Sequence, residues 1–308
     1  MHTPFRPILG LSNSVGEIKM YVVLGATGHT GGATARKLLE KGVDVRVVMR
    51  DEAKAESWRA LGAEVALADY RDVAALRKAV TGSRGVFLMN PPPDQEPNPI
   101  EAAKRQAKVY KELLSLVPRA VVLSSVGAHK AQGTGSIRTL NVLESILRDE
   151  RVVFLRPGYF AENWLNVMPL AASQGILPTF LQPLDQTVPM VATADIGVAA
   201  ADLLVADEFP KVVELLGPHD LSPRDLALQL SQALGREIAA VAVPPSQWPE
   251  QVSQWGLSQS AADLIMEMYR GINSKQVDVE SPERVWRGRT EISQALLAGF
   301  ASPAGAAL

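Results

Sequence analysis

The sequence contains no cysteine, so disulfide bonds, thiolate nucleophiles and cysteine-based metal sites are all excluded. Its charge is almost balanced: 31 Lys and Arg against 33 Asp and Glu give a formal net charge of -2, which does not indicate a nucleic-acid-binding surface. No apolar run reaches the roughly 18 residues that are required to cross a bilayer. The four histidines are scattered, without the spacing of a metal site. We therefore expect a cytoplasmic protein with a small-molecule partner and with no metal, nucleic-acid or membrane partner.

The chain has the composition of a globular protein. Its 308 residues are 47% hydrophobic and 21% charged, which suits one large or two modest domains. Residues 1–19 contain turn formers and no apolar stretch of signal-peptide length. We interpret residues 1–19 as a loose N-terminal extension, with Met20 as an alternative natural start.

From residue 20 to residue 157, apolar segments alternate with helical ones. Strands are expected at 20–24, 43–49, 63–68, 85–89, 119–123 and 152–156, and helices at 30–41, 51–61, 72–80, 100–116 and 136–148. Such alternation predicts an α/β fold with helices on both faces of a parallel sheet. The strands are apolar nearly throughout, as strands covered on both faces are. The pattern is that of a Rossmann-type, doubly wound sheet.

After residue 157 this rhythm changes. We expect residues 20–157 and about 187–217 to form the Rossmann domain. Within the second of these segments we expect a helix at 193–205, capped by Thr193, and a strand at 212–216. Residues of about 158–186 and 218–308 have mixed, shorter elements. We expect them to form a smaller substrate or lid domain over the ligand of the first.

Three glycines stand between the first strand and the first helix, in the run "VVLGATGHTGGATARKLL". Gly25 permits a tight turn, Gly28 permits the backbone to approach a pyrophosphate, and Gly31 permits the helix to pack close to the sheet. The N-terminus of the helix offers N–H groups to the anion. A strand before the motif and a helix after it are the context that supports a dinucleotide site over an ordinary glycine turn.

The residues at the end of the second strand favour NADP(H) over NAD(H). Where an acidic residue would bind the ribose 2′-hydroxyl of NAD, the sequence has Arg50, followed by Lys54. A guanidinium suits a 2′-phosphate. Asp69 and Tyr70 follow the third strand, where the adenine is expected to lie. The alternative for these residues is an ordinary solvated surface.

Other candidate cofactor-binding residues flank the glycines or follow the later strands. They are Thr27, His29, Thr30, Met89, Asn90, Ser124, Ser125, Pro157 and Gly158.

Six segments in order resemble the NmrA-like family of atypical short-chain dehydrogenases. They are "GATGHTGG", "VVMR", "LADYRD", "LSSVGA", "LRPGYFAENW" and "VATADIGVAAADLL". The resemblance implies a Rossmann fold and a nicotinamide dinucleotide. It also implies one of two functions: NADPH-dependent reduction of quinones, azo compounds or similar acceptors, or dinucleotide sensing by a regulator without turnover. Oligomers are common in this superfamily, so a homo-oligomer is possible.

The sequence departs from the superfamily at its acid dyad. Typical members place a Tyr, and four residues later a Lys, on the helix after the fifth strand. When Glu144 is aligned with a glutamate that often follows this pair, Ser136 and Leu140 occupy the Tyr and Lys positions. Ser124 and Ser125 remain only as hydrogen-bond donors. Reduction of a ketone produces an alkoxide that requires an acid, whereas a hydroquinone anion is delocalised.

We therefore predict an NADPH-dependent oxidoreductase that transfers hydride directly to a quinone, azo or similar conjugated acceptor. A sensor that binds a protein partner, and a reductase of a biosynthetic double bond, are the alternatives. His129 is a candidate substitute acid, although a lone loop histidine is more often merely exposed. The candidate acceptor pocket is a flat aromatic wall formed by Tyr159, Phe160, Asn163 and Trp164. The alternative is that these residues belong to the core between the two domains.

Overall fold

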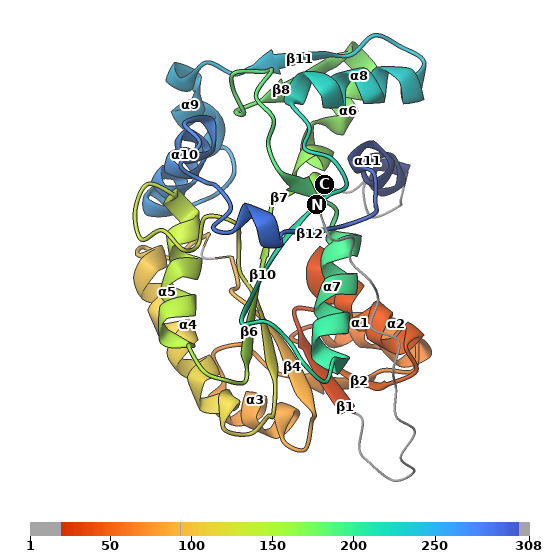
Figure 1. Ribbon diagram of the computed structural model, residues 1–308, viewed down its shortest axis with the longest axis vertical. Coiled ribbons are helices and arrows are strands. Elements are labelled where there is room, and N and C mark those ends of the chain that lie inside the picture. The colour runs from red at the N-terminus through yellow and green to blue at the C-terminus, as the bar shows by residue number, and fades with distance from the viewer. Residues whose placement is uncertain (1–19, 93, 302–308) are drawn as a thin grey trace.

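The computed structural model describes residues 20–92 and 94–301 of the chain (Figure 1). The extension expected at residues 1–19 lies outside the described residues. No helix within the described ranges has the length and apolar character of a membrane span.

An eight-stranded sheet forms the centre of the molecule, in the order β12-β10-β6-β5-β4-β1-β2-β3. Every neighbouring pair in it is parallel. The strands are β1 (Met20–Leu24), β2 (Asp44–Met49), β3 (Glu64–Leu67), β4 (Gly85–Met89), β5 (Ala120–Leu123), β6 (Val152–Pro157), β10 (Val212–Leu216) and β12 (Trp286–Arg287). The order of β1 to β6 is that of the Rossmann fold, so the predicted fold class is confirmed.

Helices cover both faces of this sheet (Figure 1). One buried cluster packs α1 (His29–Glu40), α2 (Ala55–Ala60) and α7 (Thr193–Val205) against one face. A second cluster packs α3 (Val73–Val80), α4 (Pro99–Leu114) and α5 (Arg138–Ile146) against the other. Because both faces are buried, the strands are apolar along most of their length.

The remaining elements gather at one end of the sheet (Figure 1). They include β7 (Tyr159–Phe160), the 3-10 segment η3 (Ala161–Val167), α6 (Met168–Gln174), β8 (Ile176–Thr179), β9 (Met190–Val191), α8 (Pro223–Leu234), β11 (Ala239–Ala242), α9 (Trp248–Ser253), α10 (Gln259–Asn273) and α11 (Ile292–Ala301). Two pairs of short parallel strands, β8 with β11 and β7 with β9, link these elements. The chain then returns to the central sheet, because β12 pairs with β10.

Two local details differ from the expectations. The N-cap of α7 is Ala192, and Thr193 is the first helical residue. The backbone N–H and hydroxyl of Thr193 both donate to the Glu162 carboxylate, so its side chain joins η3 to α7 instead of capping the helix. The helix expected at 136–148 is divided into the 3-10 turn η2 (Gly135–Ile137) and α5.

Candidate functional site

The glycine-rich turn joins β1 to α1. Gly25 has φ +72°, and a Cβ there would lie 2.2 Å from Sδ of Met89. A Cβ on Gly31 would lie 2.3 Å from the backbone oxygen of Gly25. The fold itself therefore requires both of these glycines.

Gly28 is different, because the fold leaves room beside it. A Cβ there would meet only the oxygen of Gly25, at 3.5 Å, and the backbone of Gly28 is extended. Gly28 is the N-cap of α1 without a side-chain cap, and Thr27, Gly28 and His29 are exposed while Thr30 is buried. An uncapped helix N-terminus behind an exposed glycine is an arrangement that suits a pyrophosphate.

Arg50 lies at the end of β2 beside the residues that follow β3. Its side chain is 67% exposed, and Nη1 is 3.9 Å from the Asp69 carboxylate. The guanidinium lies 5.7 Å from the centre of the Tyr70 ring. Lys54 is exposed at the end of the 3-10 turn η1 (Glu52–Lys54). Because the ion pair is long and exposed, Arg50 remains available to an anion.

Sequence reasoning missed Arg71 at this place. Its guanidinium lies 5.2 Å from the centre of the Tyr70 ring and donates to the Tyr70 hydroxyl at 3.0 Å. These residues border a hollow of about 680 Å³ that extends to Asn90 and to the start of α4. The sequence feature that could have predicted this role is that Arg71 directly follows Tyr70 in "LADYRD".

A second cavity, of about 380 Å³, lies where β4, β5 and β6 end, and we call it the inner cavity. It brings together many of the predicted site residues. They are Asn90, Ser124, Ser125, Gly158, Tyr159, Phe160 and Asn163. Ser136 and Leu140, which the sequence alignment predicts to stand at the dyad positions, also line it.

Three predicted residues lie behind the walls of the inner cavity and not on them. Met89 packs against Gly25, and its backbone oxygen accepts a hydrogen bond from Tyr110 at 2.7 Å. Pro157 is buried at the end of β6. Trp164 is also buried, and it borders a neighbouring hollow instead.

The inner cavity also has lining residues that sequence reasoning missed. Among them are Met268 and Ile272 of α10, and Val277 just after that helix. Met268 Sδ is 3.1 Å from the hydroxyl of Ser136. No local motif marks these residues, because they lie more than a hundred positions along the chain from the motifs that they face.

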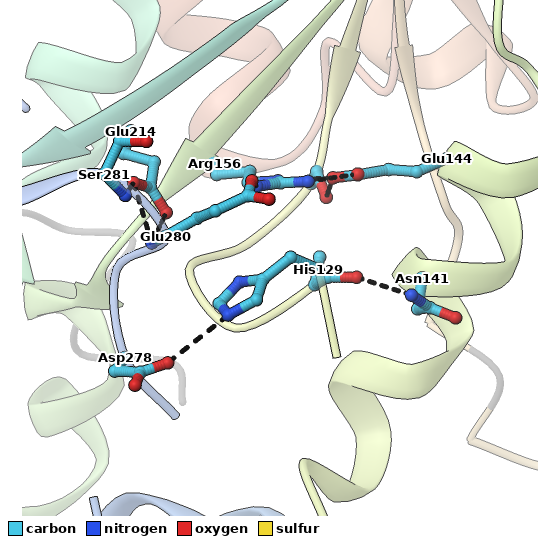
Figure 2. A network of polar contacts seen from close by, with 10 residues as sticks. His129, Asn141, Glu144, Arg156, Glu214, Asp278, Glu280 and Ser281 are labelled. Carbon is cyan, nitrogen blue, oxygen red and sulfur yellow. Dashed lines mark hydrogen bonds and ion pairs between the residues drawn. The ribbon is translucent and has the colours of Figure 1, made fainter. Parts of the chain in front are cut away.

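A polar network at the wall of this cavity includes Glu144, Arg156 and Glu280 (Figure 2). Ser124, which lines the cavity, also belongs to it. Its hydroxyl donates to Oε1 of Glu144 at 2.6 Å. Arg156 donates from Nε to Oε1 of Glu144 at 2.8 Å, from Nη2 to Oε2 at 2.6 Å, and from Nη1 to Glu280 at 2.5 Å. The Glu214 carboxylate in turn accepts from the backbone N–H groups of Glu280 and Ser281. The network fixes the orientation of Ser124, so its hydroxyl is already committed as a donor.

His129 points toward Asp278, as Figure 2 shows. Its Nε2 is 3.4 Å from the Asp278 carboxylate, which Lys130 also approaches to 2.6 Å. His129 is not among the residues that line the inner cavity. A role for it as the substitute acid therefore finds no support in this geometry.

The aromatic residues after β6 do not form one flat wall. The rings of Tyr159 and Trp164 are inclined by 69° with centroids 6.4 Å apart. The hydroxyl of Tyr159 lies 3.2 Å from that of Tyr269. Burial, with the neighbouring Tyr269 as a lesser cause, raises the pKa of Tyr159 well above its usual value. Tyr159 is therefore a neutral hydrogen-bonding group in the lining of the inner cavity.

No group of three or more His, Cys, Asp and Glu side chains within the described ranges is arranged to hold a metal ion.

The sheet order and the glycine-rich turn define a Rossmann-fold protein. More particularly, the chain belongs to the NmrA-like family, whose sequence model matches residues 18–286.

Relatives with known names share most of this length. An NAD(P)H azoreductase of Xenophilus azovorans is 28% identical over 255 residues, which cover 81% of this chain and 86% of the azoreductase. Quinone oxidoreductase 2 of Escherichia coli is 27% identical over 257 residues, which cover 80% of this chain and 85% of that enzyme. The solved structure of an NADPH-dependent quinone oxidoreductase from Escherichia coli with NADPH has a TM-score of 0.73 and 22% identity, covering 91% of this chain and 99% of that one. This last likeness shows the shared fold.

Proposed function

We propose that this protein binds NADP(H) and reduces a quinone, an azo compound or a similar conjugated acceptor by direct hydride transfer. The names of the azoreductase and quinone oxidoreductase relatives support the class of reaction. The observation that carries the proposal is the composition of the inner cavity. Its described lining includes Ser136 and Leu140 at the dyad positions and contains no charged side chain.

The residues at the glycine-rich turn fit a dinucleotide. Gly28 leaves space for the pyrophosphate to approach the backbone, and the N-terminus of α1 would face that pyrophosphate. Arg50 would bind the ribose 2′-phosphate. Asp69 and Tyr70 would border the adenine, and Asn90 would lie beside the ribose. The reduced nicotinamide, when bound, supplies the hydride.

The chain's own contribution at the reacting end is to position the acceptor and to exclude water. The inner cavity is lined mainly by apolar and uncharged polar groups, which favours a planar, uncharged acceptor. Tyr159 is its one described phenol, and a raised pKa makes it a poor acid at neutral pH. An acceptor whose reduced anion is delocalised does not need such an acid, and water can provide the proton afterwards.

The test is NADPH oxidation at 340 nm with a panel of quinones, azo dyes and simple ketones, with NADH in parallel. We expect turnover with quinones or azo dyes and none with ketones. Turnover with ketones alone would contradict direct hydride transfer without an acid. Tight binding of NADP(H) without turnover of any acceptor would overturn the proposal in favour of a dinucleotide sensor.

A further inference from the structure

We propose that a hollow next to the inner cavity binds the distal ring of a two-ring acceptor, and that this distal ring must be uncharged. We call this hollow the outer pocket. The inference rests on the proposed function, because it extends the acceptor site of that reaction. It assigns a role to aromatic residues that the dinucleotide site does not use.

The outer pocket adjoins the inner cavity. It has a volume of about 530 Å³ and shares three lining residues with the inner cavity, Tyr159, Asn163 and Met268. These three form the boundary between the two spaces. The inner cavity, at about 380 Å³, is near the lower end of the range for small-ligand sites. The nicotinamide would share the inner cavity with the acceptor, so the distal ring of a two-ring acceptor would lie beyond this boundary.

A column of aromatic rings borders the outer pocket: Phe180 and Trp255 line it, and Trp248 stacks on Phe180. The Phe180 ring is nearly parallel to the rings of Trp248 and Trp255, with interplanar angles of 18° and 12°. The centroid separations are 5.1 Å and 5.8 Å. Tyr269 meets Phe180 edge-on, at 77°. Such a column holds its outermost ring in a fixed orientation, and that ring can stack on a planar ligand.

Trp255 is that outermost ring, and it is 48% exposed. It borders the outer pocket together with Gln251 of α9 and Ile265 of α10. An exposed indole at the rim of a hollow leaves apolar surface that a ligand would remove from water. The position of Trp255 thus favours an aromatic occupant.

The charge of the lining selects among aromatic ligands. No charged side chain is found among the described residues that line the outer pocket. Its polar side-chain groups are hydroxyls, the amides of Asn163, Asn166 and Gln251, and the indole N–H groups of Trp164 and Trp255. By contrast, the hollow beside Tyr70 is lined by Arg71, Glu96 and Arg105. Because the outer pocket offers no counter-charge, a sulfonate on the distal ring would lose its hydration without compensation.

The test compares three acceptors with the wild-type protein: 1,4-benzoquinone, a neutral two-ring azo dye and the same dye sulfonated on one ring. We measure the Kd of each dye by titration calorimetry and the KM of each acceptor with NADPH. We expect the sulfonated dye to bind at least about tenfold more weakly than the neutral one. Equal affinities would overturn the requirement for an uncharged ring.

Two variants locate the dye in the outer pocket. Trp255→Ala should raise the Kd and KM of the neutral dye about tenfold by removing the stacking partner, with the KM of benzoquinone changed less than twofold. Ile265→Phe should act in the same direction by narrowing the pocket. Leu228→Ala, at an exposed position on α8, is the matched control and should change neither acceptor.

The outcomes separate this inference from the proposed function. If every acceptor is turned over but both pocket variants affect dye and benzoquinone equally, the outer pocket is not a subsite and the proposed function stands. If no acceptor is turned over, the proposed function fails, and the calorimetric Kd still decides whether the dye occupies the outer pocket. Unchanged dye affinity in both variants overturns the inference in either case.

Discussion

Arg156 and Glu144 form a two-point ion pair in the interior, with Nε to Oε1 at 2.8 Å and Nη2 to Oε2 at 2.6 Å. Both side chains are less than a tenth exposed. The pair joins β6 to α5 directly behind Ser124, at the wall of the inner cavity. It therefore holds two elements of the site in register.

Removal of the cation from this pair should be costly, because Glu144 would be left buried without a counter-charge. We expect Arg156→Leu to lower the free energy of unfolding by about 3–5 kcal/mol. Arg224→Leu is the control: its pair with Asp185 is exposed, so its loss should cost less than about 1 kcal/mol. Urea unfolding at pH 7 measures both, and equal losses would contradict the role of burial.

Glu280 should make stability depend on acid pH. The hydrogen bond from Arg156 lowers the pKa of Glu280, against a smaller opposing effect of burial. A lowered folded-state pKa stabilises the protein above the unfolded value of about 4.3. That contribution is lost as the pH falls through the folded pKa.

The measurement is urea unfolding of the wild type and of Glu280→Gln from pH 7 down to pH 3. The variant should be less stable at pH 7, and the difference should shrink as the pH falls. A difference that is constant with pH would show that the ionisation of Glu280 does not contribute.

Substitutions at two glycines of the turn should have different effects, one on the stability of the fold and the other on cofactor affinity. Gly31→Ala places a Cβ 2.3 Å from a backbone oxygen, so we expect a loss of about 1–3 kcal/mol in unfolding free energy. Gly28→Val should keep the stability of the wild type and lose at least about tenfold in NADPH affinity, since only the ligand needs that space. Thermal unfolding and NADPH titration of both variants are the measurements. Undiminished NADPH binding by Gly28→Val would refute the pyrophosphate assignment.

Arg50 should distinguish the two dinucleotides. We expect Arg50→Ala to weaken NADPH at least about tenfold, through loss of charge-assisted hydrogen bonds to the 2′-phosphate. NADH, which lacks this phosphate, should change less than twofold. The control is Arg59→Ala on α2, where Arg59 is paired with Glu52. Equal weakening of NADPH and NADH by Arg50→Ala would contradict the assignment.

Ser136 should be dispensable for turnover. Its hydroxyl contacts Met268 Sδ, and we predict from the alignment that it stands at the position of the superfamily's acid tyrosine. We expect Ser136→Ala to change kcat/KM for a quinone by less than twofold, as should Ser145→Ala, an exposed serine on α5. A loss of more than tenfold in Ser136→Ala alone would show that the hydroxyl takes part in the reaction.

The part of the fold that follows local rules was predictable. The apolar runs from β1 to β6 alternate with amphipathic helices, and this alternation leads to one parallel sheet because each helix must cover a face. The glycine-rich turn was equally readable, since the dihedral angle of Gly25 and the close packing of Gly31 are properties of a few adjacent residues. The cap expected at Thr193 was wrong, because the partner of that side chain, Glu162, lies 31 residues away.

The sequence by itself determined the strands β1 to β6 and the glycine-rich turn, because each depends on residues that are neighbours along the chain. Only the tertiary structure decided which distant residues pack against these elements. It placed Met268 and Val277 on the inner cavity, and it joined Arg156 to Glu280 across 124 positions. It also paired His129 with Asp278, outside the cavity lining. Such contacts arise from packing between distant segments, and no local periodicity of the sequence records which distant segment will pack there.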